Sequence, residues 1–191
     1  WKDYRDANSD KILLKFDDYR AVMRCVEEVR KHPVAGDLLM APGYTERCYQ
    51  AVIDGMVCRC KPDKLCQWRD KTIVVDLKTT TDTTPNKFVK SIERFGYHRQ
   101  EYFYRKVLSA PENAIHVDAF VFVAVNDTEP HCVDCYELDQ EWLDFARDEV
   151  EPALADLKRR TDQNDWKSAT ENCVIRVSPP SYMKFKGQYS L

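Results

Sequence analysis

The stretch that decides the fold reads Lys61-Pro62-Asp63 and, after a short gap, Ile73-Val74-Val75-Asp76-Leu77-Lys78-Thr79-Thr80. A Pro-Asp pair is thus followed thirteen positions later by Asp-x-Lys, which closes a β-branched apolar run. Because side chains alternate along a strand, Asp76 and Lys78 are expected on the same face. Two carboxylates and an amine at the edge of a sheet are suited to holding Mg²⁺ and cleaving a phosphodiester.

Length and composition predict one folded domain. The chain has 191 residues, of which 43% are hydrophobic and 32% charged, which is ordinary for a soluble protein with a substantial core. We expect a single domain over residues 1–191, with its core at about 17–160 and a tail at 161–191 that is a candidate oligomer contact. The polar start at Trp1 is no signal peptide, and the first residue is not Met, so flanking sequence can be missing. The apolar run from Ala119 to Val125 is too short to span a bilayer.

The charge balance excludes a uniformly basic DNA-coating protein, because the net charge is −3 and the pI is about 5.9. A metal-dependent nuclease concentrates acids at its site and needs only a local basic lining. The candidates for that lining are Arg59, Lys61, Lys64, Arg69, Lys87, Lys90, Arg94, His98, Arg99, Arg105 and Lys106. For each of them alone, a solvated surface charge is the simpler interpretation.

The eight cysteines predict neither a disulfide framework nor a metal cluster. The chain is large and has no secretory signal, which argues against disulfides. Cys132-x-x-Cys135 has no second CxxC, and the group of Cys58, Cys60 and Cys66 lacks a clear fourth ligand. We therefore expect free thiols in a reducing cytosol.

Periodicity and turn signals predict an α/β (α+β) fold with a central mixed, mostly antiparallel sheet flanked by helices. Helices are expected at about 17–31, 34–40, 85–95, 97–108 and 139–160. Strands are expected at about 44–53, 56–60, 65–68, 72–78, 115–125 and 132–137. Asp54-Gly55 predicts a hairpin turn, and Gly96 interrupts the two middle helices.

The neighbourhood of Asp76 supports a functional interpretation over a solvent-facing salt bridge with Lys78. The preceding run is apolar on both faces, so the strand is expected to be central, and a charged pair at its end is costly unless it is used. Asp63 is expected at the end of the neighbouring strand, where two adjacent carboxylates repel and a divalent cation resolves the repulsion. Gln100 and Tyr104 form an i, i+4 pair. Taken alone they suit a solvent-facing Gln and a core Tyr, whereas beside the carboxylates they can orient the scissile phosphate.

Together these residues resemble the PD-(D/E)XK nuclease superfamily. The resemblance rests on Lys61-Pro62-Asp63, on Val75-Asp76-Leu77-Lys78-Thr79-Thr80 and on Gly96-Tyr97-His98-Arg99-Gln100-x-x-x-Tyr104. Within the superfamily the chain is similar to the exodeoxyribonuclease VIII (RecE) type of phages and prophages, over residues from about 19 to 160. A restriction-endonuclease-like core is then implied. One departure is Cys60, which stands before the Lys-Pro-Asp step where a small residue is expected.

The resemblance implies roles for the site residues. Asp63 and Asp76 ligate Mg²⁺ or Mn²⁺, with the Leu77 carbonyl as a further ligand. Lys78 orients or activates the attacking water, and the pair Gln100 and Tyr104 is the accessory element. The implied upstream ligand is either Glu46 or His32, and both have simpler interpretations: a strand surface acid for Glu46 and a helix C-terminal residue for His32. For DNA contacts we expect Arg59, Lys61 and Arg99.

The resemblance also implies an activity and its partners. The implied enzyme is a Mg²⁺-dependent 5′→3′ exonuclease on linear double-stranded DNA, which leaves 3′ single-stranded tails for recombination. A trimeric or tetrameric ring around the DNA, a single-strand annealing protein as partner, and the cytoplasm of a bacterium or phage-infected cell follow as expectations. Two alternatives stay open: an iron–sulfur CRISPR- or helicase-associated exonuclease of the same superfamily, and a non-catalytic DNA-binding module on the same fold.

Overall fold

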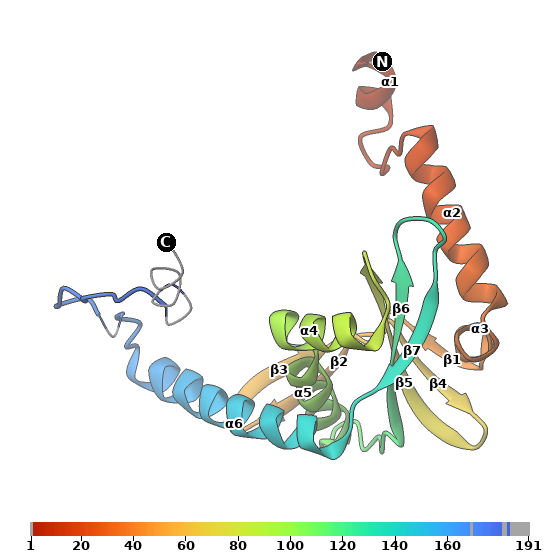
Figure 1. Ribbon diagram of the computed structural model, residues 1–191. Coiled ribbons are helices and arrows are strands. Elements are labelled where there is room, and N and C mark those ends of the chain that lie inside the picture. The colour runs from red at the N-terminus through yellow and green to blue at the C-terminus, as the bar shows by residue number, and fades with distance from the viewer. Residues whose placement is uncertain (1, 169, 181–182, 184–191) are drawn as a thin grey trace, which may run out of the picture.

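A computed structural model describes residues 2–168, 170–180 and 183, and its centre is a five-stranded sheet (Figure 1). The strand order is β1-β4-β5-β6-β7, and only the central pair, β5 and β6, is parallel. The strands of this sheet are β1 (Gly43–Thr45), β4 (Lys64–Trp68), β5 (Lys71–Thr80), β6 (Ala119–Asn126) and β7 (Val133–Glu137). A separate hairpin pairs β2 (Tyr49–Ile53) with β3 (Met56–Cys60). The predicted mixed, mostly antiparallel sheet is therefore confirmed.

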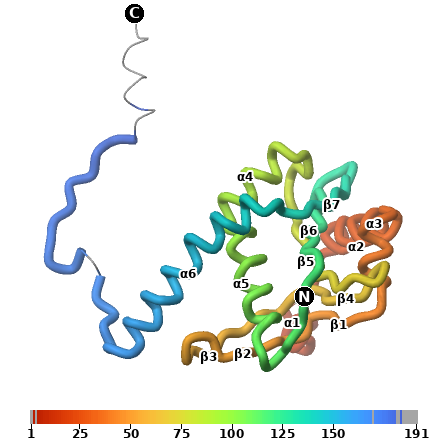
Figure 2. The backbone as a smooth tube through the Cα atoms, turned by 90° about the horizontal axis from the view of Figure 1, so that it is seen from below, coloured from red at the N-terminus to blue at the C-terminus, as the bar shows by residue number. Residues whose placement is uncertain are grey.

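Helices cover both faces of this sheet (Figures 1 and 2). The helices are α1 (Lys2–Ala7), α2 (Phe16–Lys31), α3 (Pro33–Met40), α4 (Pro85–Phe95), α5 (Tyr97–Ser109) and α6 (Gln140–Gln163). One face carries α2 and α3, and the other carries α4 and α5, with α6 and the β2–β3 hairpin packed against α5. None of the helices in the described part of the chain is both long and apolar enough to cross a membrane.

Two apolar cores lie on either side of β5, which explains why its apolar run has no polar alternation. Val74 belongs to the core under α4 and α5, together with Phe88 and Phe122. Val75 belongs to the core under α2 and α3, together with Leu38. Each such buried side chain contributes about 1.5–3 kcal/mol relative to exposure, so β5 is a rigid base for the side chains at its end.

The predicted strand at 44–53 is wrong as a single element. The chain leaves β1 after Thr45, takes a positive φ of 53° at Glu46, and enters β2 in a different sheet at Tyr49. The Glu46 N–H donates to the Asp63 carbonyl over 3.0 Å, which ties the turn to the residue before β4. The break therefore places an acid next to the Pro-Asp step.

Other boundaries shift for local reasons. Residues 115–118 are not a strand, because Ala114 turns the chain with a φ of 50° and β6 begins only at Ala119. β5 extends two residues beyond the prediction, since it pairs with β6 as far as Thr80. Gly96 lies between α4 and α5 with a φ of 69°, where a left-handed residue is needed. The short helix α1 is not among the predicted elements.

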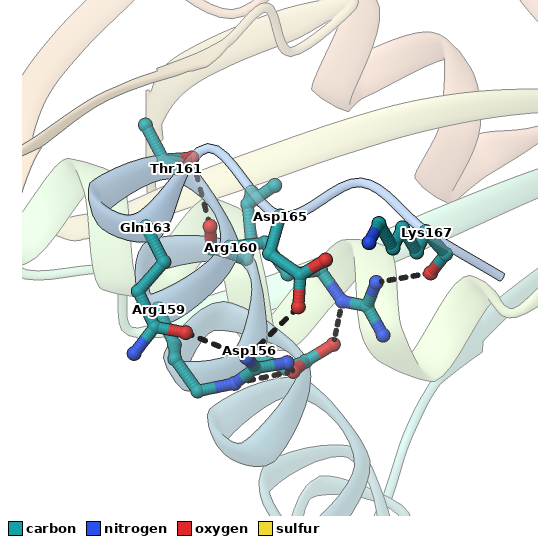
Figure 3. A network of polar contacts seen from close by, with 8 residues as sticks. Asp156, Arg159, Arg160, Thr161, Gln163, Asp165 and Lys167 are labelled. Carbon is teal, nitrogen blue, oxygen red and sulfur yellow. Dashed lines mark hydrogen bonds and ion pairs between the residues drawn. The ribbon is translucent and has the colours of Figure 1, made fainter. Parts of the chain in front are cut away.

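A polar network closes the end of α6 (Figure 3). The Asp156 carboxylate accepts hydrogen bonds from Arg159 and Arg160, and the Arg160 guanidinium also donates to the Lys167 carbonyl over 3.0 Å. Exposed ion pairs of this kind each contribute at most about 1 kcal/mol. The network nevertheless directs the first residues of the tail. The oligomer contact expected of the tail at 161–191 falls partly on residues 181–182 and 184–191, which lie outside the described residues.

A buried acid on α5 makes stability depend on pH. Glu101 is fully buried and pairs with Arg105 at 2.9 Å. Burial raises the pKa of Glu101 from about 4.5 to about 7, although the Arg105 charge opposes the shift. Between these values the folded state holds a proton that the unfolded state has lost, so stability falls as pH rises.

Glu101→Gln is therefore expected to stabilise the protein at pH 8 and to leave it nearly unchanged at pH 4.5 or below. The shift corresponds to roughly 3.5 kcal/mol at most, from about 1.4 kcal/mol per pKa unit. Urea unfolding of both proteins across this pH range measures the difference, with exposed Glu93→Gln on α4 as the control. A Glu101→Gln protein that is equally or less stable at pH 8 contradicts this account.

Candidate active site

The site forms where β5 extends beyond the end of β4. β4 begins at Lys64, which pairs with Val75, so the residues of β5 after Val75 have β6 alone as a neighbouring strand. Asp76 is 3% exposed there, and the Lys78 ammonium forms an ion pair with its carboxylate. Both side chains lie on the face covered by α5, as strand alternation requires. A charged pair is thus held almost out of water at the end of a rigid strand.

Gln100 joins the two charged groups. Its amide Nε2 donates to Asp76 Oδ2 over 2.5 Å, and its Oε1 accepts from the Lys78 ammonium over 2.9 Å. One amide therefore matches an acceptor and a donor at once, which assigns its orientation. The position of Gln100 in the first turn of α5 brings this helix to the end of β5.

Asp63 is held at the edge of β5 that faces away from β6. Its Oδ2 accepts from the Leu77 N–H over 2.7 Å. Because the N–H and C=O of one strand residue point to the same side, the Leu77 carbonyl also faces the region where β4 has ended. Burial raises the pKa of Asp63, and the charges of Asp76 and Glu46 raise it further against the opposing hydrogen bond from Leu77.

Glu46 lies beside Asp63. Its carboxylate forms an ion pair with Lys61, and the hydrogen bond from Lys61 lowers the pKa of Glu46. Together with its backbone bond to Asp63, this contact gathers Glu46, Lys61 and Asp63 at one corner of the site. Cys60, which precedes them, is buried, and burial raises the pKa of its thiol to about 12, so it is an inert small core residue.

His32 is placed elsewhere. Its Nδ1 accepts from the Ala35 N–H over 3.1 Å and so caps α3. The Cys135 Sγ lies 4.0 Å from the same nitrogen, within the core under α2 and α3. The structure therefore holds His32 on the sheet face opposite to Asp76. Of the two proposed upstream ligands, only Glu46 is brought next to Asp63.

Two tyrosines of α5 frame the site. The Tyr104 hydroxyl lies 3.5 Å from the Lys61 carbonyl and beside the Gln100 amide, and burial raises the pKa of this phenol. The Lys78 ammonium lies 4.5 Å from the centre of the Tyr97 ring, a cation–π distance. Sequence reasoning missed Tyr97 as a site residue. The signal was its spacing, because Tyr97, Gln100 and Tyr104 at i, i+3 and i+7 share one helix face.

The expected basic lining is only partly present. Arg59 on β3 donates to Gln50 over 3.0 Å, Lys61 lies at the site, and Arg99 is 3.7 Å from Glu149 on α6. Lys64 and His98 are wrong as members of an exposed basic lining, because they are only 8% and 5% exposed. Lys64 donates to the Leu39 carbonyl, because its amine must find an acceptor inside the protein. Arg105 and Lys106 are likewise paired with Glu101 and Glu151.

The donor set is compatible with a hard divalent cation. Among the described residues no three His, Cys, Asp or Glu side chains converge as a ready-made metal site. Mg²⁺, however, takes only one or two carboxylates and otherwise oxygen ligands and water. Asp76 Oδ1 is buried without a hydrogen-bond partner among the described residues, and it forms an ion pair with the Lys78 ammonium. Asp63, Asp76 and the Leu77 carbonyl thus fit such a cation.

Comparison with solved structures bears on the fold of the chain. A solved structure from Eubacterium rectale, described as "Putative exonuclease", has a TM-score of 0.67 and 14% sequence identity, over 96% of this chain and 72% of that one. Its likeness shows the fold. The structure of SSO0001 is 18% identical over 78% of this chain and 60% of that one, but its TM-score of 0.39 is too low to support an argument.

Sequence comparison places the chain in a family. No curated protein matches it. The family model described as a PDDEXK-like domain of unknown function (DUF3799) matches residues 2–177, which is nearly the whole chain. The matched range includes Asp63, Asp76 and Lys78. The chain belongs to this PDDEXK-like family.

Proposed function

We propose that the protein is a metal-dependent deoxyribonuclease that hydrolyses phosphodiester bonds at the ends of linear duplex DNA. The observation that carries the proposal is the joining of Asp76 and Lys78 by Gln100 at the end of β5, with Asp63 beside them. An ordinary salt bridge at the surface would be exposed, whereas Asp76 is buried at the strand end and shares the Gln100 amide with Lys78. The family's PDDEXK-like description and the exonuclease-like fold support the same class.

Each residue has a role in this proposal. Asp63 and Asp76 hold Mg²⁺ or Mn²⁺, which when bound acts as a Lewis acid and lowers the pKa of water. The Lys78 ammonium, next to Asp76, orients the attacking water and stabilises the negative charge that develops on the phosphate. Gln100 fixes the relative positions of these two groups, and the Tyr97 ring contacts the Lys78 ammonium.

The finer features of the proposal rest on the resemblance of the motifs to RecE-type enzymes. They are a 5′→3′ polarity, 3′ single-stranded products for recombination by annealing, a homo-oligomeric ring, a single-strand annealing partner and a cytoplasmic location. Sequence-independent binding suits an acidic chain, because phosphate contacts need only a few local cations such as Lys61 and Arg59.

The testing experiment is digestion of linear duplex DNA labelled separately at its 5′ and 3′ ends, with Mg²⁺ or with EDTA, beside closed circular duplex. The expected result is metal-dependent loss of the 5′ label from linear DNA, with the circles intact. Cutting of the circles would instead identify an endonuclease. DNA binding without turnover under Mg²⁺ or Mn²⁺ would overturn the proposal in favour of a non-catalytic module, and bound iron would point to the iron–sulfur alternative.

A further inference from the structure

A groove of about 570 Å³ runs along β1 and β4 on the face of the sheet that carries the site. Tyr44, Arg47 and Tyr49 line part of it, and residues 112–116 of the loop after α5 also line it. Tyr44 and Arg47 lie within two residues of Glu46 in the chain, so this part of the groove adjoins the corner where Glu46 meets Asp63. The proposed reaction uses none of these three lining residues.

The strand register places Tyr44 close to the site. Tyr44 pairs with Leu65, and Leu65 pairs with Val74, so the three side chains form one row across β1, β4 and β5. Asp76 is the next residue of β5 on that face. With about 4.8 Å between strands and about 6.8 Å between same-face residues, the Tyr44 Cα lies about 12 Å from that of Asp76. A DNA strand that leaves the site in this direction passes Tyr44 within a few nucleotides.

Tyr44 and Arg47 form a stacking platform. The Arg47 guanidinium carbon lies 4.4 Å from the centre of the Tyr44 ring and 5.3 Å from that of Tyr49. Tyr44 is 56% exposed although it is aromatic, and Arg47 forms no ion pair within the described part of the chain. An exposed ring beside a planar cation is the arrangement on which unpaired bases stack.

A buried polar atom adds a second, independent observation. Tyr49 is 5% exposed, and its hydroxyl has no hydrogen-bond partner among the described residues. Such an atom costs about 1–3 kcal/mol while it stays unpaired, so an unused hydrogen-bonding group lies beneath the exposed ring and the guanidinium. The acids of the groove are occupied elsewhere: Glu112 accepts from the Val52 N–H and Asp118 from the Thr72 N–H. Their negative charges repel phosphates, so a nucleotide is expected to bind only in the part of the groove beside Tyr44 and Arg47.

We propose that Tyr44 and Arg47, with Tyr49 beneath them, bind a base of single-stranded DNA next to the nuclease site. The occupant is a single strand because the faces of bases in a duplex are covered by their neighbours, whereas an unpaired base exposes its face. This inference rests on the proposed function, since it names the strand that the same site handles. The exposed edge of the sheet at β1 is thereby assigned to single-stranded DNA and not to a protein partner.

The test uses binding without turnover. A fluorescein-labelled oligothymidylate of about eight nucleotides is titrated with the full chain in EDTA, and its anisotropy is measured, beside a blunt duplex. Tyr44→Ala is expected to weaken binding of the single strand roughly five-fold or more. Tyr44→Phe, which keeps the ring, should retain it. Tyr19→Ala is the matched control, because Tyr19 is 50% exposed and belongs to α2, the helix on the opposite face of the sheet (Figure 1).

Every outcome decides the matter. Equal single-strand affinity of Tyr44→Ala and wild type overturns the inference, as does an equal loss for duplex and single strand, or no binding by the wild type. If binding depends on Tyr44 but no cleavage is found, the inference stands and the proposed function fails. If cleavage is found and Tyr44→Ala binds normally, the reverse holds. Circular dichroism establishes that each variant is folded.

Discussion

Asp76→Asn is expected to abolish DNA cleavage, with a loss on the order of 10³-fold or more. Asparagine keeps the size of Asp76 and an oxygen that can accept from Gln100. It removes the negative charge that a divalent cation needs and that balances Lys78. The measurement is the rate of release of labelled nucleotides from linear duplex DNA under Mg²⁺, together with calorimetric titration of Mn²⁺, whose binding should weaken in parallel.

The matched control for this experiment is Asp70→Asn in the turn between β4 and β5. Asp70 is exposed and has a φ of 62°, a conformation that asparagine also tolerates. The control should cleave at the wild-type rate and bind Mn²⁺ equally well. Retained cleavage in highly purified Asp76→Asn would remove Asp76 from the chemistry. A collapse of its circular dichroism spectrum would show instead that the residue holds the fold.

Local sequence patterns suffice to predict most of the fold. The apolar run before Asp76 predicts a central strand because each of its side chains enters one of two cores, and Val74 and Val75 do so. Gly96 predicts a helix break because a left-handed residue is needed there. The break at Glu46 could not be read from the sequence, since it depends on a backbone bond to Asp63 in a distant part of the chain.

In the site, too, some features follow from local sequence patterns and others depend on contacts between distant parts of the chain. Strand alternation suffices to place Asp76 beside Lys78, and helix spacing suffices to place Gln100 beside Tyr104. Which upstream residue joins Asp63 is a question of tertiary packing. His32 and Glu46 are indistinguishable by local pattern, but α3 holds His32 across the sheet, whereas the turn after β1 brings Glu46 to the Pro-Asp corner.

Lys78→Met is expected to separate cation binding from cleavage. The methionine side chain can occupy the space beside the Tyr97 and Phe122 rings, where the lysine now lies, so packing is kept. Loss of the ammonium should lower the cleavage rate by about 10²–10³-fold, the usual cost of removing one group that stabilises developing charge. Cation affinity should not fall, because the positive charge that contacts Asp76 and repels the cation has gone.

Single-turnover cleavage and Mn²⁺ titration of the same Lys78→Met preparation test this separation. Lys106→Met is the matched control, since Lys106 is a half-buried lysine of α5 that pairs with Glu151 at 2.7 Å, away from the site. The control should cleave normally. If Lys78→Met cleaved normally too, the lysine would be only a partner of the Asp76 charge. If it lost Mn²⁺ binding as Asp76→Asn does, the lysine would act by holding Asp76 in place, because removal of a competing cation can only favour binding.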